Sequence, residues 1–314
     1  MRRENKMISV TGLTKVFDGY KALENVTCQI PEGCIYGMVG SNGAGKSTFL
    51  RLISGVYKAD GGTVEIDGQP VYENPDIKNI IAFVPDDLFF INNASMKRMA
   101  SMYSRYYKNF DMERFMFLTE TFKLNPNKSL NTFSKGMRRQ AAIILAVSCR
   151  PKYLFLDETF DGLDPVMRNL VKSLICKDVE ERKATAILTS HSLRELEDTC
   201  DQLALLHKGG LVFESDITNM KTSLFKVQTA FLDDYDKSRF DKLELLHFAK
   251  SGSVSNMIVK GDRDEVAEHI RSMNPALLDI LPLSLEEVFT YEMEALGYSF
   301  DVELLETEGT INEK

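Results

Sequence analysis

The residues of this sequence best suited to chemistry form one glycine-rich stretch, Gly40-Ser41-Asn42-Gly43-Ala44-Gly45-Lys46-Ser47-Thr48. It fits the pattern G-x-x-x-x-G-K-[ST], in which glycines let successive backbone N–H groups turn inward and cradle phosphates. Lys46 is expected to reach the β- and γ-phosphates, and the Ser47 hydroxyl is placed for Mg²⁺. The stretch therefore predicts a site for a nucleoside triphosphate with Mg²⁺.

The flanking residues strengthen this prediction. Residues 34–39 form a short apolar run with strand character, and residues 49–53 continue a helix that begins at Lys46 and can end at Gly55. A strand, a loop and a helix in this order aim a helix N-terminus at the phosphates. The alternative is a glycine-rich turn that binds nothing.

Two adjacent carboxylates, Asp157 and Glu158, end the apolar run 152–158, which is expected to be a buried strand. Phosphoryl transfer needs positioning and charge neutralisation more than covalent chemistry. Asp157 can hold Mg²⁺ directly or through water, and Glu158 can polarise the attacking water. The alternative for either residue is a surface or helix-capping acid.

A histidine, His191, follows the expected strand Thr185–Thr189 and could donate a hydrogen bond to the γ-phosphate or to the attacking water. The alternative is a half-buried structural histidine. The glycine-rich stretch, the two acids and His191 all fall at the carboxyl ends of expected strands, where ligands bind in α/β sheets.

The first half of the chain predicts β-structure followed by helices. Residues 7–39 are expected to be antiparallel β with a turn at Asp18-Gly19, and Asp67-Gly68 predicts a hairpin between residues 63–66 and 71–72. Residues 80–84 read as a buried strand. About residues 88–150 the patterns are helical, with helices expected at 96–107, 112–123 and 134–149.

From residue 152 onward strands and helices alternate, with helices expected at 165–177 and 192–200 and a hairpin at 203–213. Such alternation predicts a mostly parallel sheet covered on both faces. The expected fold class is α/β: a P-loop NTPase core with an antiparallel β subdomain, an inserted helical subdomain and a small C-terminal α+β appendage.

Three segments are expected along the chain. Residues 1–217 would form the nucleotide-binding domain, residues 218–298 a small α+β domain, and the acidic residues 299–314 a flexible tail. In the second segment, strands are expected at 225–231 and 254–259, and a helix near Asp262. A further helix would begin at Ser284, with Glu287 completing a capping box, and end at Gly297.

Composition excludes several classes of protein. The 314 residues are 44% hydrophobic, enough for a sizeable core, and the net charge of −8 argues against a nucleic-acid partner. Five cysteines without a C-x-x-C pair fit reduced thiols in a cytosolic protein. The charged start lacks the apolar segment of a signal peptide, and no apolar run approaches the length of a membrane span.

Together these motifs resemble the nucleotide-binding subunit of an ABC transporter over about residues 7–215. The resemblance rests on Walker A at Gly40–Thr48, Walker B at Tyr153–Asp157 followed by Glu158, the signature position Phe133–Met137, the D-loop Asp161–Asp164 and the switch histidine His191. Lys135 and Met137 depart from the usual signature L-S-G-G-Q.

The resemblance implies further site residues. Ser134 and Gly136 would make a second phosphate site at a helix N-terminus, facing the ATP of a partner subunit, with a plain N-cap as the alternative. Phe17 would stack on adenine, with Tyr20 as competitor. Arg138 and Arg139 are expected to face solvent or a partner rather than to act in catalysis.

Asp86 stands where the family usually has the Q-loop glutamine. A glutamine there would offer its carbonyl to Mg²⁺ or water and its amide to the protein, whereas a carboxylate brings charge and no donor. The hypothesis is that Asp86 still reaches the metal through water and couples the helical subdomain to the nucleotide. Asp87 is the alternative occupant of this role.

The function implied by the resemblance is an ATP-hydrolysing subunit that powers an ABC transporter, and more narrowly an exporter of the ABC-2 type. The partners implied are a second nucleotide-binding subunit, identical or a close paralogue, closing head-to-tail, and a separately encoded transmembrane permease. The subunit would then be cytoplasmic and peripheral on the inner face of the membrane. The alternatives are an ABC ATPase that is not part of a transporter and a regulatory module that senses ATP.

Overall fold

The computed structural model describes residues 7–217 and 224–295. The chain divides into two compact units between Asp216 and Ile217. The expected acidic tail 299–314 and the expected helix end at Gly297 lie outside the described residues. No helix in the described ranges is both long and apolar enough to cross a membrane.

The first unit is organised around a six-stranded sheet with the order β10-β9-β3-β8-β7-β6. Its strands are β3 (Ile35–Val39), β6 (Ile81–Val84), β7 (Tyr153–Leu156), β8 (Thr185–Ser190), β9 (Gln202–His207) and β10 (Gly210–Asp216). All neighbouring pairs are parallel except β9 with β10. The prediction of antiparallel β throughout residues 7–39 is wrong for β3, which is buried along its length between two parallel neighbours.

A second sheet of this unit is antiparallel, with the order β2-β1-β4-β5. Its strands are β1 (Met7–Phe17), β2 (Tyr20–Pro31), β4 (Gly61–Ile66) and β5 (Gln69–Pro70). The predicted turn at Asp18-Gly19 is confirmed, and so is the hairpin at Asp67-Gly68. The second hairpin strand lies at Gln69–Pro70 and not at the expected residues 71–72. Val71 follows this strand, packs in the core and donates its N–H to the Val64 carbonyl oxygen at 3.3 Å.

The helices of the first unit are α1 (Lys46–Ile53), α2 (Pro75–Asn79), α3 (Met96–Tyr106), α4 (Met112–Thr121), α5 (Lys135–Ser148), α6 (Pro165–Arg182) and α7 (Leu193–Glu197), with the 3-10 turn η1 (Leu130–Thr132). Ser134 is the N-cap of α5, as predicted. The helix α6 runs five residues past the predicted end at Lys177, α7 stops short of Cys200, and α2 was not predicted.

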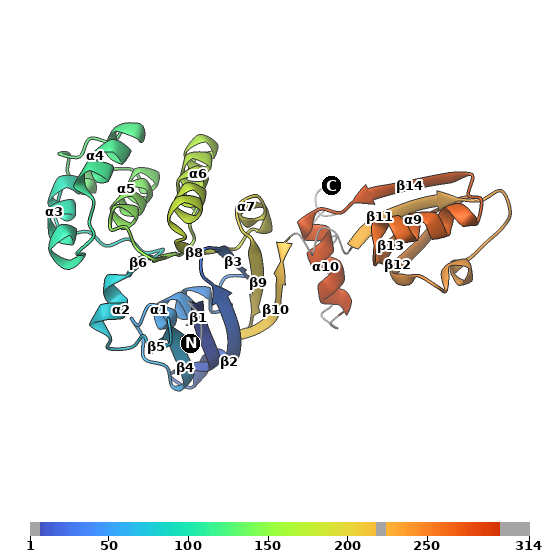
Figure 1. The fold of residues 1–314 in the computed structure, drawn as a ribbon, viewed down its shortest axis with the longest axis horizontal. Helices are drawn as coiled ribbons and strands as arrows, with labels where there is room; N and C mark the ends of the chain where they lie inside the picture. Colours follow the sequence, from blue (N-terminus) through green and yellow to red (C-terminus); the bar gives the residue numbers. More distant parts are fainter. Residues whose placement is uncertain (1–6, 218–223, 296–314) are drawn as a thin grey trace, which may run out of the picture. The chain divides into compact units, whose positions relative to one another are not determined.

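These helices lie in two groups. The apolar side chains of α1, among them Phe49 and Leu50, share one core with both sheets. In the view of Figure 1, α3, α4, α5 and α6 lie at the top and the antiparallel sheet lies at the bottom. The strand ends that follow β6 and β7 therefore lie between the helical subdomain and the P-loop side of the core.

The second unit is a small α+β fold. Its antiparallel sheet has the order β12-β13-β11-β14. The elements are β11 (Leu224–Ala230), η2 (Lys237–Phe240), β12 (Glu244–Ser251), β13 (Val254–Lys260), α9 (Arg263–Ser272), β14 (Leu277–Pro282) and α10 (Leu285–Ala295). Phe240, Met257 and Ile270 are among its core residues. The predicted capping box is confirmed, since Glu287 accepts from Ser284 and Ser284 accepts from the Glu287 N–H.

Candidate active site

The glycine-rich stretch forms a loop between β3 and α1. Gly43 and Gly45 have φ values of 80° and 108°, which glycine adopts without strain. A Cβ at Gly45 would lie 2.7 Å from the Ala22 carbonyl oxygen, and one at Gly40 would lie 2.4 Å from that of Leu206. The loop is therefore packed tightly against the chain, and glycine is required at both positions.

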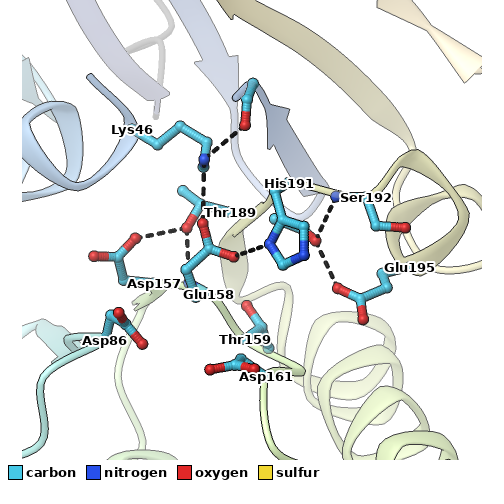
Figure 2. Close-up of polar contacts among 12 residues, drawn as sticks. Lys46, Asp86, Asp157, Glu158, Thr159, Asp161, Thr189, His191, Ser192 and Glu195 are labelled. Carbon is cyan, nitrogen blue, oxygen red and sulfur yellow. Dashed lines mark hydrogen bonds and ion pairs between the residues drawn. The ribbon is translucent and has the colours of Figure 1, made fainter. Parts of the chain in front are cut away.

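Lys46 begins α1 and is only 5% exposed. Its Nζ donates to the Gly40 carbonyl oxygen at 2.7 Å and forms an ion pair with Glu158 Oε1 at 3.1 Å. Figure 2 shows the Lys46 side chain reaching toward Glu158 from the P-loop side. The buried ammonium also donates to the Ser41 carbonyl oxygen at 3.3 Å, so one carboxylate and two carbonyls compensate it.

Glu158 joins the lysine to the histidine. Its Oε2 lies 3.0 Å from His191 Nδ1, while its Oε1 contacts Lys46 (Figure 2). The His191 side chain is 56% exposed, so its other ring nitrogen can reach a ligand. The neighbours of His191 fix its loop, because Ser190 Oγ donates to Glu195 at 2.6 Å and accepts from the Ser192 N–H at 3.0 Å.

Thr189 positions both acids, and sequence reasoning missed it. Its hydroxyl donates to Asp157 Oδ1 at 2.7 Å and accepts from the Glu158 N–H at 2.9 Å. Thr189 is the penultimate residue of the buried strand β8 and lies beside the acids because β7 and β8 are parallel neighbours. A polar residue near the carboxyl end of an apolar strand next to Walker B was the available signal.

Asp157 has the surroundings expected of a metal ligand. It is fully buried, and its Oδ2 has no hydrogen-bond partner among the described residues. A buried carboxylate oxygen without a partner is costly unless a cation binds it. The donor set therefore fits Mg²⁺, for which Asp157 and the Ser47 hydroxyl are the candidate ligands.

Asp86 follows β6 and forms an ion pair with Arg139 of α5 at 2.7 Å. The expectation that Arg139 faces solvent or a partner is wrong, because its side chain is 2% exposed. The guanidinium is turned inward by the helix and donates to carbonyl oxygens of Pro85, Asp86 and Asp157. The sequence Arg138-Arg139 alone does not tell which of the two arginines lies on the inward face of the helix.

One pocket of about 370 Å³ collects most of the predicted site. It is lined by residues of the P-loop, the two competing aromatics, Ala22 of β2 and two acids, namely Phe17, Tyr20, Ala22, Asn42, Gly43, Ala44, Gly45, Lys46, Ser47, Thr48, Asp86 and Glu158. Phe17 packs edge-on against Tyr57 with ring centroids 5.6 Å apart. Both Phe17 and Tyr20 are therefore available to an adenine at the mouth of the pocket.

Ser134 and Gly136 lie at the N-terminus of α5 and do not line this pocket. Ser134 Oγ caps the helix by accepting from the Met137 N–H at 3.2 Å. A Cβ at Gly136 would lie 2.5 Å from the Gly162 carbonyl oxygen, so the helix end touches the segment 161–164. Lys135 extends this contact through an ion pair with Asp161, whose hydrogen bond lowers the pKa of that carboxyl.

Comparison with known proteins gives a consistent result. The sequence pattern of the family described as "ABC transporter" matches residues 23–161. The chain is similar to the ABC transporter ATP-binding protein YtrB of Bacillus subtilis, with 31% identity over 90% of this chain and 97% of that protein. It is also similar to the daunorubicin/doxorubicin resistance ATP-binding protein DrrA of Streptomyces peucetius, with 32% identity over 70% of this chain and 68% of that protein.

A solved dimeric structure of a bacterial ABC transporter cassette shares the fold. It superposes with a TM-score of 0.61 and 22% identity, covering 67% of this chain and 99% of the cassette. The likeness supports the α/β class of P-loop NTPase core that the strand order already indicates.

Proposed function

The chain belongs to the family of ABC transporter ATP-binding proteins, and on that premise we propose that it powers an exporter through a separate membrane permease. It is an ATP-binding subunit and an ATP hydrolase, as its family is. The observation that carries the mechanism is that Glu158, which lines the P-loop pocket together with Lys46, contacts both Lys46 and His191.

In this proposal the γ-phosphate enters between Lys46 and Glu158. Lys46 exchanges its ion pair for phosphate oxygens and neutralises their charge. Glu158 is then released from Lys46 and orients the attacking water as a general base, while His191 donates to the γ-phosphate or to that water. The backbone N–H groups from Gly40 to Thr48 cradle the phosphates.

Mg²⁺ would be held by Asp157 and the Ser47 hydroxyl, with Asp86 reaching it through water. When bound, the ion neutralises charge that develops on the β- and γ-phosphate oxygens. Thr189 holds the Asp157 carboxylate through Oδ1, which leaves Oδ2 for the ion. Phe17 is assigned to stack on adenine, and Tyr20 is placed to share this role.

The proposed partners are a second nucleotide-binding subunit, identical or a close paralogue, and a permease encoded separately. Ser134 and Gly136 would meet the ATP of that second subunit, so the two subunits close head-to-tail. The dimeric state of the similar cassette supports the pairing, and the resistance named for DrrA supports the export direction. The subunit would then act in the cytoplasm, on the inner face of the membrane.

The domain assignment belongs to the same proposal. Residues 1–217 are the nucleotide-binding domain, with the helical subdomain at about 88–150, and residues 218–298 are a separate C-terminal domain. The change of unit at Asp216 and the separate core around Phe240 support this division.

A first test is Mg²⁺-dependent ATP hydrolysis by the full chain with and without Lys46→Ala. Loss of the ammonium removes the main positive charge at the phosphates, so hydrolysis should fall by about a hundredfold or more. Phosphate release and ATP binding are measured on the same samples. A wild-type chain that binds no ATP in the presence of Mg²⁺ would contradict the proposal.

A further inference from the structure

Arg139 is a buried cation that ties three parts of the site together. It lies in the second turn of α5, and its guanidinium donates to oxygens of two neighbouring strand ends. Beyond β6 it contacts the Pro85 carbonyl at 2.9 Å, the Asp86 carbonyl at 3.2 Å and the Asp86 carboxylate at 2.7 Å. Beyond β7 it contacts the Asp157 carbonyl at 3.1 Å.

Asp86 compensates the buried positive charge of Arg139. A buried guanidinium is strongly unfavourable without a paired carboxylate. In the part of the chain that the structure describes, Asp86 provides the one carboxylate in an ion pair with Arg139. The acid at this position therefore has a structural explanation: a neutral glutamine in place of Asp86 would leave Arg139 without a counter-charge.

Asp86 also lies between two pockets. On one side it lines the nucleotide pocket with Lys46 and Glu158. On the other it lines a pocket of about 270 Å³ together with Phe133, Lys135 and Arg138 near the start of α5. A displacement of α5 would consequently move Arg139, and with it both Asp86 and the main chain of the candidate metal ligand Asp157.

We propose that Arg139 is a positioning residue that couples α5 to the Mg²⁺ site by holding Asp86 and the Asp157 main chain in place. The inference rests on the proposed function and adds the residue through which the helical subdomain acts. The fork of the guanidinium is needed, because one ammonium cannot reach four acceptors in this geometry.

The test combines a double-mutant cycle with a Mg²⁺ titration on the full chain. The variants are Asp86→Asn, Arg139→Met, their combination and Arg139→Lys. Arg138→Met is the matched control, since Arg138 is the preceding residue and donates instead to the Leu88 carbonyl. Each variant is melted without nucleotide, and ATP-dependent stabilisation is followed as a function of Mg²⁺ concentration and in EDTA.

Asp86→Asn should lower Tm by about 5 °C, because it leaves the guanidinium unpaired. Adding Arg139→Met should recover at least half of that loss, whereas adding Arg138→Met should recover none. The Mg²⁺ concentration that gives half of the ATP-dependent stabilisation should rise about tenfold in Arg139→Met and in Arg139→Lys, as for other residues that orient metal ligands. ATP binding in EDTA should not change.

Additive Tm losses, or an unchanged Mg²⁺ midpoint in the Arg139 variants, would overturn the inference. Arg139→Lys keeps the positive charge at this position, so the Mg²⁺ titration can be done on this variant if Arg139→Met does not fold. A wild-type chain that ATP fails to stabilise would contradict the proposed function itself. A wild-type chain stabilised by Mg²⁺ and ATP, with Arg139 variants that behave like it, would contradict only the role of Arg139.

Discussion

Single side chains decide how the two acids of the site are oriented, and Thr189 is the clearest case. One hydroxyl both donates to Asp157 and accepts from the Glu158 N–H. Glu158 has a φ of 43°, an uncommon conformation for a residue with a side chain. The hydrogen bond from the Glu158 N–H to Thr189 Oγ1 helps to hold this conformation, so one hydroxyl positions both acids.

Thr189→Val is expected to reduce the rate of ATP hydrolysis about tenfold while ATP affinity changes little, because misplaced catalytic groups cost rate more than binding. The unpaired Glu158 N–H should also cost about 1–3 kcal/mol of stability. Turnover and ATP binding are measured separately on folded protein.

Thr185→Val provides the matched control on the same strand. Thr185 is equally buried and accepts from the Gly33 N–H at 2.9 Å, at the opposite end of β8. Its loss should lower stability but leave turnover per folded molecule intact. Equal loss of turnover in both variants would show that Thr189 acts only through stability.

The burial of single cysteine side chains predicts that the rate of thiol reaction depends on pH. Burial raises the pKa of Cys28, Cys34 and Cys149 to about 12. Because a raised pKa leaves less thiolate, only about one such thiol in ten thousand is ionised at pH 8. Reaction with a disulfide reagent should be slow in the native protein, faster by about tenfold per pH unit, and complete for all five cysteines after denaturation.

Fast titration of all five thiols in the native protein at pH 8 would contradict the raised pKa values. The half-buried Cys176 is expected to react first.

The proximity of Lys46, Glu158 and His191 could be predicted, because each follows a strand in an α/β pattern and parallel strands end at one edge. Thr189 lies near the carboxyl end of β8, so its place at this edge could be expected, but its two hydrogen bonds depend on β7 being the neighbouring strand. The contribution of Arg139 depends on the rotation of α5, which is not encoded within a short window of sequence. The inward turn of Arg139 requires Asp86 and two carbonyls from distant segments.

At the level of elements, the N-terminus of α5 is in tight contact with the segment 161–164. Gly136 faces the Gly162 carbonyl, and a side chain there would overlap backbone. Gly136→Ala should therefore cost about 1–3 kcal/mol and push α5 away from the segment 161–164. Thermal unfolding and hydrogen exchange of residues 135–164 would measure both effects.

Lys135→Ala is the control for Gly136→Ala. Lys135 is the adjacent residue, and its ion pair with Asp161 is solvent-exposed, so little stability should be lost. If Gly136→Ala is as stable as Lys135→Ala, the tight approach of the helix to this segment is incorrect.

Elements with a strong local signal could be predicted, and those set by tertiary pairing could not. The caps Ser134 and Ser284 mark α5 and α10 because their side chains bond to the helix N-termini. The parallel pairing of β3 depends on partners far along the chain, β8 and β9. The strands β12 and β14 were missed, since their outward residues interrupt the apolar pattern.

At the scale of the whole molecule, the chain holds one P-loop pocket in the first unit and a separate fold in the second. The start of α5, with Ser134 and Gly136, does not line that pocket. In the proposed dimer, this helix end completes the site of another subunit. ATP is therefore proposed to join two nucleotide-binding subunits.

Glu158→Gln tests this claim most directly. The substitution removes the proposed general base and the negative charge that faces the γ-phosphate, so ATP should stay bound without being hydrolysed. The molar mass of the full chain is measured by light scattering after gel filtration, with Mg²⁺ and with or without saturating ATP.

We predict a mass of 35.6 kDa without ATP and twice that value with it, and no doubling when Lys46→Ala is added. A Glu158→Gln chain that binds ATP yet stays at 35.6 kDa at saturation would contradict the head-to-tail dimer.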